Sequence, residues 1–350
     1  MTLEILVAGA LTLALLLFAL AGGADFGGGI WTLLARGERG EDQARLVDRA
    51  VGPVWEANEL WIVVAVAILW VGFTDAFVAY GIALFVPLAL VLSGILLRGA
   101  FFAFQHEADY LPMSRAFEVF GKAFGAVSIV SPVFFGMAAG TIASGRLRFD
   151  SAPPEDGRFA TGAPADGYFQ AWIGPFPILI GVLALITCAY LAAVYLTMEA
   201  GDDPEMQEIF RRRGIVSGIV LAALGLLAFP AAAVDAEYMW RGLTSFPALG
   251  FMFAAAAALA ASVALLVTRR FWWARTAAIL EVVAVFGAWA SAQYPYLLVP
   301  DITVQSAASP RPALVALLIL SFFYATILGP SLALMLKIFK SSSSGARGHP

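Results

Sequence analysis

Gly52-Pro53-Val54-Trp55-Glu56-Ala57-Asn58-Glu59-Leu60-Trp61 places two carboxylates, an amide and two indoles at the start of a long apolar run. Proline is well tolerated in the first turn of a helix, so Pro53 indicates a helix start, and Glu56 and Glu59 then share one face. Ionisable groups at the edge of the hydrocarbon are costly and mark candidate functional sites, whereas acids at a helix start also stabilise its dipole. Both interpretations remain open for this pair.

The composition is that of a membrane protein. Of 350 residues, 61% are hydrophobic and only 13% are charged, whereas a soluble domain has about a quarter of its residues charged. A spanning helix needs about 20 mostly apolar residues. The sequence therefore predicts an all-α polytopic fold with nine transmembrane helices in a single domain, 1–340, followed by a flexible cytoplasmic tail, 341–350. The predicted spans lie near 3–24, 55–73, 77–98, 122–143, 171–197, 215–233, 247–267, 275–293 and 313–336. The first is expected to be a retained helix because Glu4, and no Lys or Arg, precedes its apolar run.

The distribution of basic residues predicts the orientation. Sixteen of the 21 Lys and Arg residues fall in one set of alternate loops and in the C-terminal segment, and five fall on the opposite side. Because basic residues concentrate in cytoplasmic loops, the N-terminus is expected outside and the C-terminus in the cytoplasm of a multi-pass inner-membrane protein. A connection at 144–170, rich in Gly, Pro and Asp, reads as an irregular exterior loop.

Asp25 lies within a glycine-rich segment, Gly22–Gly29, near the cytoplasmic end of the first predicted helix. Gly23 and Gly27 form a small-xxx-small pair, which allows a neighbouring helix to approach closely. The predicted topology brings Asp25 to the same membrane face as Glu56 and Glu59, where carboxyl groups could carry protons. The competing interpretation is that these acids pair with nearby arginines; Arg98 is either a membrane anchor or such a counter-ion.

Other polar and aromatic residues carry weaker signals. Glu281 lies inside the eighth predicted helix, and two interpretations of it stay open. It either pairs with a partner across a helix interface or belongs to a second polar path. Trp55 and Trp61 fit an interfacial aromatic belt. Haem and copper sites need several suitable ligands, and the chain has two histidines, His106 and His349, so no cofactor is expected to be ligated by this chain. No basic patch suited to nucleic acid is visible.

The segment from Gly52 to Trp61 closely resembles the Gly-Pro-Val-Trp-acid-small-Asn-Glu-apolar-Trp segment of subunit II of the cytochrome bd quinol oxidases. The segments Gly23-Ala24-Asp25-Phe26-Gly27, Leu97-Arg98-Gly99 and Ala292-Gln293-Tyr294-Pro295-Tyr296-Leu297 are similar to further parts of that family, in the same order. The ten-residue segment is specific, and the others support it.

The resemblance implies eight helices in two four-helix bundles plus one peripheral helix, and a haem-bearing subunit I as partner. In that family the partner holds haem b and haem d, or a third haem b, and the complex oxidises quinol and reduces O2 to water. Subunit II contributes an acid to a cytoplasmic proton path, and Glu56 matches that position, with Asp25, Asn58 and Glu59 expected to assist. Arg98, Trp55 and Trp61 would support the path. A small accessory subunit is left open.

Two other functions are compatible with these sequence features. A stand-alone proton-coupled transporter would also have intramembrane acids and glycine-interrupted helices. A pure assembly scaffold would have all of its acids in ion pairs.

Overall fold

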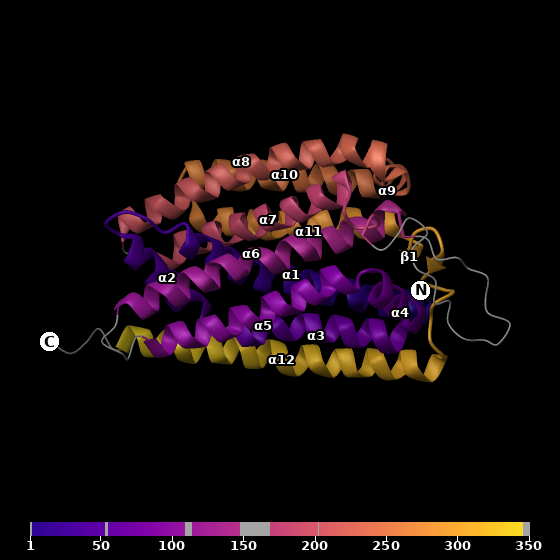
Figure 1. Cartoon of the computed structure of the whole chain (residues 1–350), viewed down its shortest axis with the longest axis horizontal. Helices are drawn as coiled ribbons and strands as arrows, with labels where there is room; N and C mark the ends of the chain where they lie inside the picture. The colour runs from indigo at the N-terminus through magenta and orange to yellow at the C-terminus, as the bar shows by residue number, and fades with distance from the viewer. Residues whose placement is uncertain (1, 53–54, 109–113, 148–168, 202, 346–350) are drawn as a thin grey trace.

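The computed structural model describes residues 2–52, 55–108, 114–147, 169–201 and 203–345. Within these ranges the chain forms twelve α-helices and one two-stranded antiparallel sheet, which confirms the all-helical class (Figure 1). The elements in chain order are α1 (Leu3–Leu33), α2 (Gly40–Val51), α3 (Trp55–Gly72), α4 (Thr74–Ala83), α5 (Phe85–Ala108), α6 (Ser114–Ser144), α7 (Pro175–Glu199), α8 (Pro204–Asp235), α9 (Glu237–Leu243), α10 (Ala248–Val267), α11 (Phe271–Gln293), β1 (Tyr296–Leu298), β2 (Ile302–Thr303) and α12 (Arg311–Gly345).

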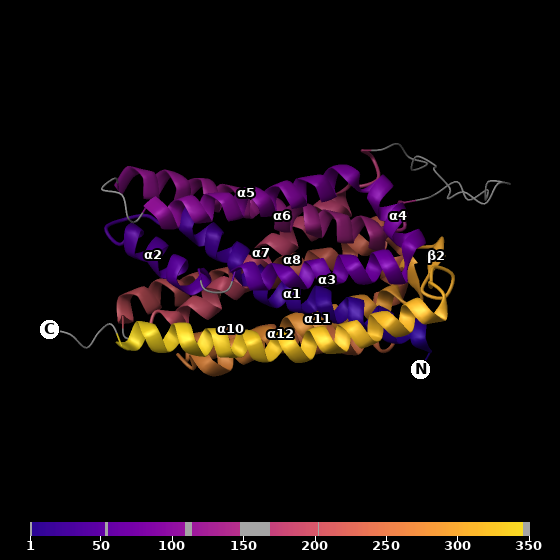
Figure 2. The ribbon, with the colours of Figure 1, turned by 90° about the horizontal axis from the view of Figure 1, so that it is seen from below.

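Eight helices among the described residues are long and apolar enough to cross a membrane: α1, α3, α5, α6, α7, α8, α10 and α11. In α12, the stretch Arg311–Ile327 is apolar but shorter. The long helices run side by side, and the start of α1 and the end of α12 lie at opposite ends of the assembly (Figures 1 and 2). The chain is therefore a multi-pass helical membrane protein.

Helix α1 lies at the centre of the packing. It contacts α3, α6 and α7, while α7, α8, α10 and α11 contact one another in sequence and α12 packs against α1 and α3. The glycine-rich half of α1 makes this possible: a Cβ at Gly27 would overlap the carbonyl of Cys188 on α7 and lie 2.6 Å from the Cβ of Ala192. The predicted close approach at Gly23 and Gly27 is confirmed. Helix α1 continues to Leu33, beyond the predicted end near residue 24.

Helix α2 lies between the first two predicted spans, where no helix was predicted. Glu41, Asp42 and Arg49 are exposed, whereas Ala44, Val47 and Val51 recur at helical spacing and are buried. Val47 and Val51 pack in one apolar cluster with Phe124 of α6 and Phe210 of α8. A surface helix therefore closes the end of the bundle next to the glycine-rich half of α1.

Several predicted boundaries differ from the structure. The span predicted at 77–98 is split between α4 and α5, because Pro87 has no N–H and its ring would clash with the carbonyl of Ala83 in a continuous helix. Helix α8 begins at Pro204, where the Asp203 side chain accepts a hydrogen bond from the Met206 backbone N–H, and so precedes the predicted 215. Helix α12 runs through 341–345, which was predicted as flexible tail. Residues 346–350, and 148–168 of the predicted exterior loop, lie outside the described residues.

At the end of the bundle opposite α2, short elements follow the long helices. Helix α9 connects α8 to α10, and the hairpin of β1 and β2 follows α11 (Figure 1). The side chain of Tyr80 reaches this hairpin by donating a hydrogen bond to the Leu297 carbonyl at 2.5 Å. None of these short elements is visible as an apolar span in the sequence.

Candidate functional site

Asp25 is a buried acid held by a neighbouring helix. It lies on α1 with 4% of its surface exposed, among the glycines through which α1 approaches α7. The Asn58 side-chain amide on α3 donates a hydrogen bond to Asp25 Oδ2 at 2.7 Å. The two residues predicted to assist a proton path are thus in direct contact. Its burial excludes a solvent-exposed position for Asp25 in this chain.

Glu59, the residue after Asn58 on α3, forms an ion pair with Arg98. The Arg98 guanidinium on α5 donates to Glu59 Oε1 at 2.5 Å, and its carbon lies 4.4 Å from the centre of the Phe26 ring on α1. Arg98 is 1% exposed and the Glu59 side chain 20% exposed. Arg98 is therefore a buried counter-ion that links α1, α3 and α5, rather than a residue extending to the membrane surface.

Asp25, Asn58, Glu59 and Arg98, here named the rim cluster, make one electrostatic unit. Asp25 lies within electrostatic range of both Arg98 and Glu59. Two carboxyl groups thus share one guanidinium, and the Nε of Arg98 has no hydrogen-bond partner among the described residues. The charge of Glu59 is neutralised by direct contact with Arg98. Asp25 depends on the Asn58 amide and on the more distant charge of Arg98. Such a site can hold a proton without disrupting its hydrogen bonds, because an amide offers both a donor and an acceptor.

Glu56 is placed differently from the other predicted residues. It lies in the first turn of α3, is exposed, and makes no ion pair or hydrogen bond with the described residues. Pro53, from which the helix start was predicted, lies outside the described residues. The structure therefore brings Asn58 and Glu59 into the rim cluster and leaves Glu56 at its solvent-facing edge.

The two tryptophans of the same segment pack against aromatic rings. Trp55 lies 5.8 Å from the Phe102 ring of α5, and Trp61 lies 6.2 Å from the Tyr324 ring of α12, measured between ring centres. They hold α3 against two neighbouring helices. Both tryptophans therefore make packing contacts between helices, which are compatible with a place in an aromatic belt.

Glu281 belongs to a different part of the molecule. It is 4% exposed on α11, and its Oε2 has no hydrogen-bond partner among the described residues. It lies within electrostatic range of Tyr190 on α7, whose hydroxyl group donates to Ser262 on α10 at 2.5 Å. Glu281 is therefore not an extension of the rim cluster.

The family model of the cytochrome bd terminal oxidase subunit II matches residues 3–339 of the chain. The chain belongs to this family. Its fold is similar to that in the structure of bd oxidase from Geobacillus thermodenitrificans, with a TM-score of 0.80, 22% identity, and coverage of 97% of this chain and 99% of that one.

Two curated relatives share 24% identity with this subunit II family member. They are the cytochrome bd ubiquinol oxidase subunit 2 of Bacillus subtilis, matched over 64% of this chain and 62% of the relative, and the cytochrome bd-I ubiquinol oxidase subunit 2 of Escherichia coli K12, matched over 52% and 45%. The chain thus spans roughly half to two thirds of the length of the curated relatives that it matches.

Sequence reasoning missed some partners of the rim cluster in this subunit II chain. The sequence did not predict the Phe26 ring beneath Arg98, or the position of Cys188, whose Sγ would lie 3.6 Å from a Cβ at Gly23. The Gly23 and Gly27 spacing was the available signal for this contact. Among the described residues, no three His, Cys, Asp or Glu side chains form a group that could hold a metal ion. The side chains of both histidines lie outside the described part.

Proposed function

We propose that this chain is subunit II of a bd-type terminal oxidase that oxidises quinol and reduces O2 to water. The observation that carries the proposal is the family match over residues 3–339, joined to a buried acid cluster suited to proton transfer. In this proposal, subunit I is the partner and holds haem b with haem d or a third haem b. Those groups supply the electron transfer and oxygen chemistry. An accessory subunit remains compatible with this assignment.

The proposed topology has nine crossings in two four-helix bundles and one peripheral helix, with the N-terminus outside. The opposite positions of the two chain ends support an odd number of crossings (Figure 1). In this proposal α1, α3, α5 and α6 form one bundle, α7, α8, α10 and α11 form the other, and α12 is peripheral; the contacts of α5 with α6 and of α10 with α11 support it, and α7 joins the two bundles by packing against α1 and α6. The cytoplasmic face is then the end that carries α2, in the bacterial inner membrane.

The chain itself contributes a scaffold and a proton path. Glu56 takes up protons from water, because it is exposed and unpaired among the described residues. Glu59 lies on the next turn of α3, where residues three apart are neighbours, and its charge is held by Arg98. Asp25 is the inner member, since Asn58 can donate to its carboxylate form and accept from its protonated form.

Glu56→Gln tests the path, because the amide keeps the shape of the side chain and cannot exchange a carboxyl proton. Loss of a general acid or base costs about 100-fold to 10,000-fold in rate, and we expect at least a tenfold fall in quinol-dependent O2 consumption. The haem absorption spectrum of the purified complex should be unchanged. Glu41→Gln is the matched control, because Glu41 is an exposed acid at the same end that pairs with Arg45.

The outcomes separate the rival functions. Unchanged turnover in Glu56→Gln would remove Glu56 from the path and favour a pure scaffold. Purification of the chain without any haem-bearing partner, in an active form, would favour the transporter. Asp25→Asn should reproduce the loss of turnover if Asp25 is the inner member.

A further inference from the structure

A small cavity lies at the end of the bundle opposite the rim cluster. Its volume is about 230 Å³, and it is formed where α6, α9, α11 and the β1 hairpin meet. Drug-sized ligands occupy pockets of about 300–1,000 Å³, so this cavity has room for a smaller group. Because α6 and α11 both end here, at Ser144 and Gln293, the cavity lies at the depth where a bilayer changes from hydrocarbon to headgroups.

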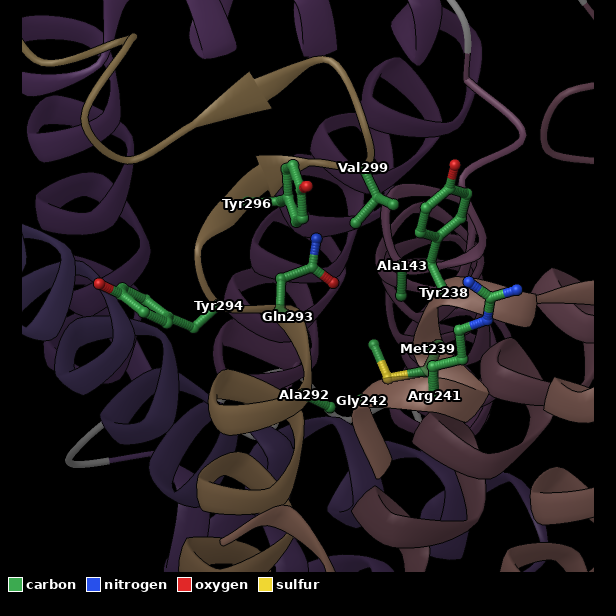
Figure 3. A pocket seen from close by; sticks show the side chains of 10 residues that line it. All are labelled: Ala143, Tyr238, Met239, Arg241, Gly242, Ala292, Gln293, Tyr294, Tyr296 and Val299. Atoms are coloured by element: carbon green, nitrogen blue, oxygen red, sulfur yellow. The ribbon is translucent and has the colours of Figure 1, made fainter. Parts of the chain in front are cut away.

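Gln293 gives the cavity an unsatisfied acceptor. Its side chain is 6% exposed, its Nε2 donates to the Leu297 carbonyl at 3.3 Å, and its Oε1 has no partner among the described residues. The bond to Leu297 fixes which end of the amide faces inward, since the reverse orientation would place two oxygens together. Figure 3 shows the amide among the residues that line the cavity. A buried carbonyl oxygen without a donor is costly, so a ligand with an O–H or N–H group would be favoured.

Arg241 places a cation at the edge of this cavity. Its guanidinium pairs with Glu237 four residues earlier, but both side chains are about 70% exposed, at 71% and 68%. Such exposed pairs contribute little and exchange readily. The guanidinium can therefore donate to an additional anionic oxygen, and phosphate is the group that its planar fork matches well. Figure 3 shows Tyr238 next to Arg241 and Tyr296 next to Gln293, with Ala143 and Met239 between the two pairs.

We propose that this cavity binds the headgroup of a phospholipid whose phosphodiester substituent ends in a hydrogen-bond donor. The phosphate contacts Arg241, and the terminal hydroxyl or ammonium group donates to Gln293 Oε1. The segments on either side of α9 in the chain carry exposed apolar side chains that suit acyl chains: Val234, at the end of α8, is 90% exposed, and Phe246, just before α10, is 89% exposed. Helix α9 lies between these two positions in the chain.

Phosphatidylethanolamine and phosphatidylglycerol both meet this requirement, whereas phosphatidylcholine has a fully methylated nitrogen and no donor. Native mass spectrometry of the purified complex, with each lipid added in the same acyl form, measures the preference. We expect the two donor lipids to bind about tenfold more tightly than phosphatidylcholine, which corresponds to about 1.4 kcal/mol. Equal binding of all three lipids would overturn the proposal.

Variants locate the preference in this cavity. Gln293→Leu should abolish the preference for donor lipids, whereas Arg241→Gln should weaken the binding of all three lipids, because each of them carries the phosphate. Tyr294→Phe is the matched control, because its ring points away from the other labelled side chains in Figure 3, and it should retain the preference. A preference that survives Gln293→Leu would contradict the proposed site. Because this variant also loses the bond to Leu297, the lipid comparison on the unaltered complex stands as an independent test.

A soluble compound could present the same chemistry, and a second measurement separates the two sources. The thermal unfolding midpoint of the delipidated complex is compared with phosphatidylglycerol and with glycerol 3-phosphate. We expect the lipid to raise the midpoint and the soluble phosphate to leave it unchanged at millimolar concentration. An equal rise with both, or retention of a quinone in place of phospholipid by the purified complex, would refute the assignment to a lipid headgroup.

Discussion

Replacing Arg98 with methionine removes the cation of the rim cluster and keeps most of its apolar stem. Arg98 is 1% exposed and contacts Glu59 at 2.5 Å, so the variant leaves Glu59 without its counter-ion and Asp25 without its nearest cation. Removing one partner of a buried ion pair costs about 3–5 kcal/mol. The Glu59 side chain is 20% exposed and regains some hydration, which places the expected loss near the lower end, at about 3 kcal/mol.

The assay is thermal unfolding of the purified complex in one detergent, followed by a double-mutant cycle. For large domains about 1 kcal/mol corresponds to about 2 °C, so Arg98→Met should lower the midpoint by about 6 °C. The double variant Arg98→Met with Glu59→Gln should lose less than the sum of the single variants, by at least about 1 kcal/mol. Arg45→Met is the control, because Arg45 is 43% exposed in a pair on α2 and should cost less than about 0.5 kcal/mol. Additive effects of the two substitutions, or a loss in Arg98→Met no greater than in the control, would refute a buried, coupled pair.

Gly27→Ala should destabilise the chain by about 1–3 kcal/mol through overpacking against α7, whereas Gly9→Ala, where a Cβ meets nothing within 4 Å, should be neutral; equal midpoints for both variants would contradict the tight contact. Glu281→Leu should raise the unfolding midpoint, because it removes a buried oxygen that lacks a partner among the described residues, and a lower midpoint would instead indicate a partner needed for folding. Hydrogen bonds from Arg39 hold the pKa of Asp203 below its ordinary value of 3.8, so Asp203 stabilises the fold above that pH and the benefit is lost as the pH falls further. Asp203→Asn should therefore unfold at a lower midpoint than the unaltered protein at pH 7, with the difference shrinking below pH 3.8; a constant difference would exclude this linkage.

The helical membrane fold was predictable because apolar runs long enough to span a bilayer depend on local sequence alone. The apolar runs did not show where each helix begins and ends, because packing against neighbouring helices also decides those boundaries. The break between α4 and α5 follows from Pro87 and was available in the sequence, whereas the continuation of α1 through Gly29 depends on the surface of α7. Helix α2 was missed because its charged residues suggested a loop, although the spacing of Ala44, Val47 and Val51 indicated one apolar face.

The candidate site was predictable in its residues and not in its geometry. Spacing placed Glu56 and Glu59 on one face of a helix, but only the position of α5 decides that Glu59 meets Arg98 while Glu56 stays exposed. Likewise, the contact between Asn58 and Asp25 requires α3 to lie against α1. The cavity at Gln293 could not be predicted, because it depends on a hairpin of three and two residues that follows α11. The roles of these residues in proton transfer remain proposals.

The position of Arg98 late in the first third of the chain has a consequence for biogenesis. Within the described residues, the acids of α1 and α3 find their common cation only on α5. During synthesis, the first two spans would therefore enter the bilayer with carboxyl groups that must stay protonated or remain near the aqueous boundary until α5 emerges from the ribosome. We expect a nascent chain stopped before residue 98 to be handled as an incomplete product by quality-control proteases, and one stopped after α5 to persist longer.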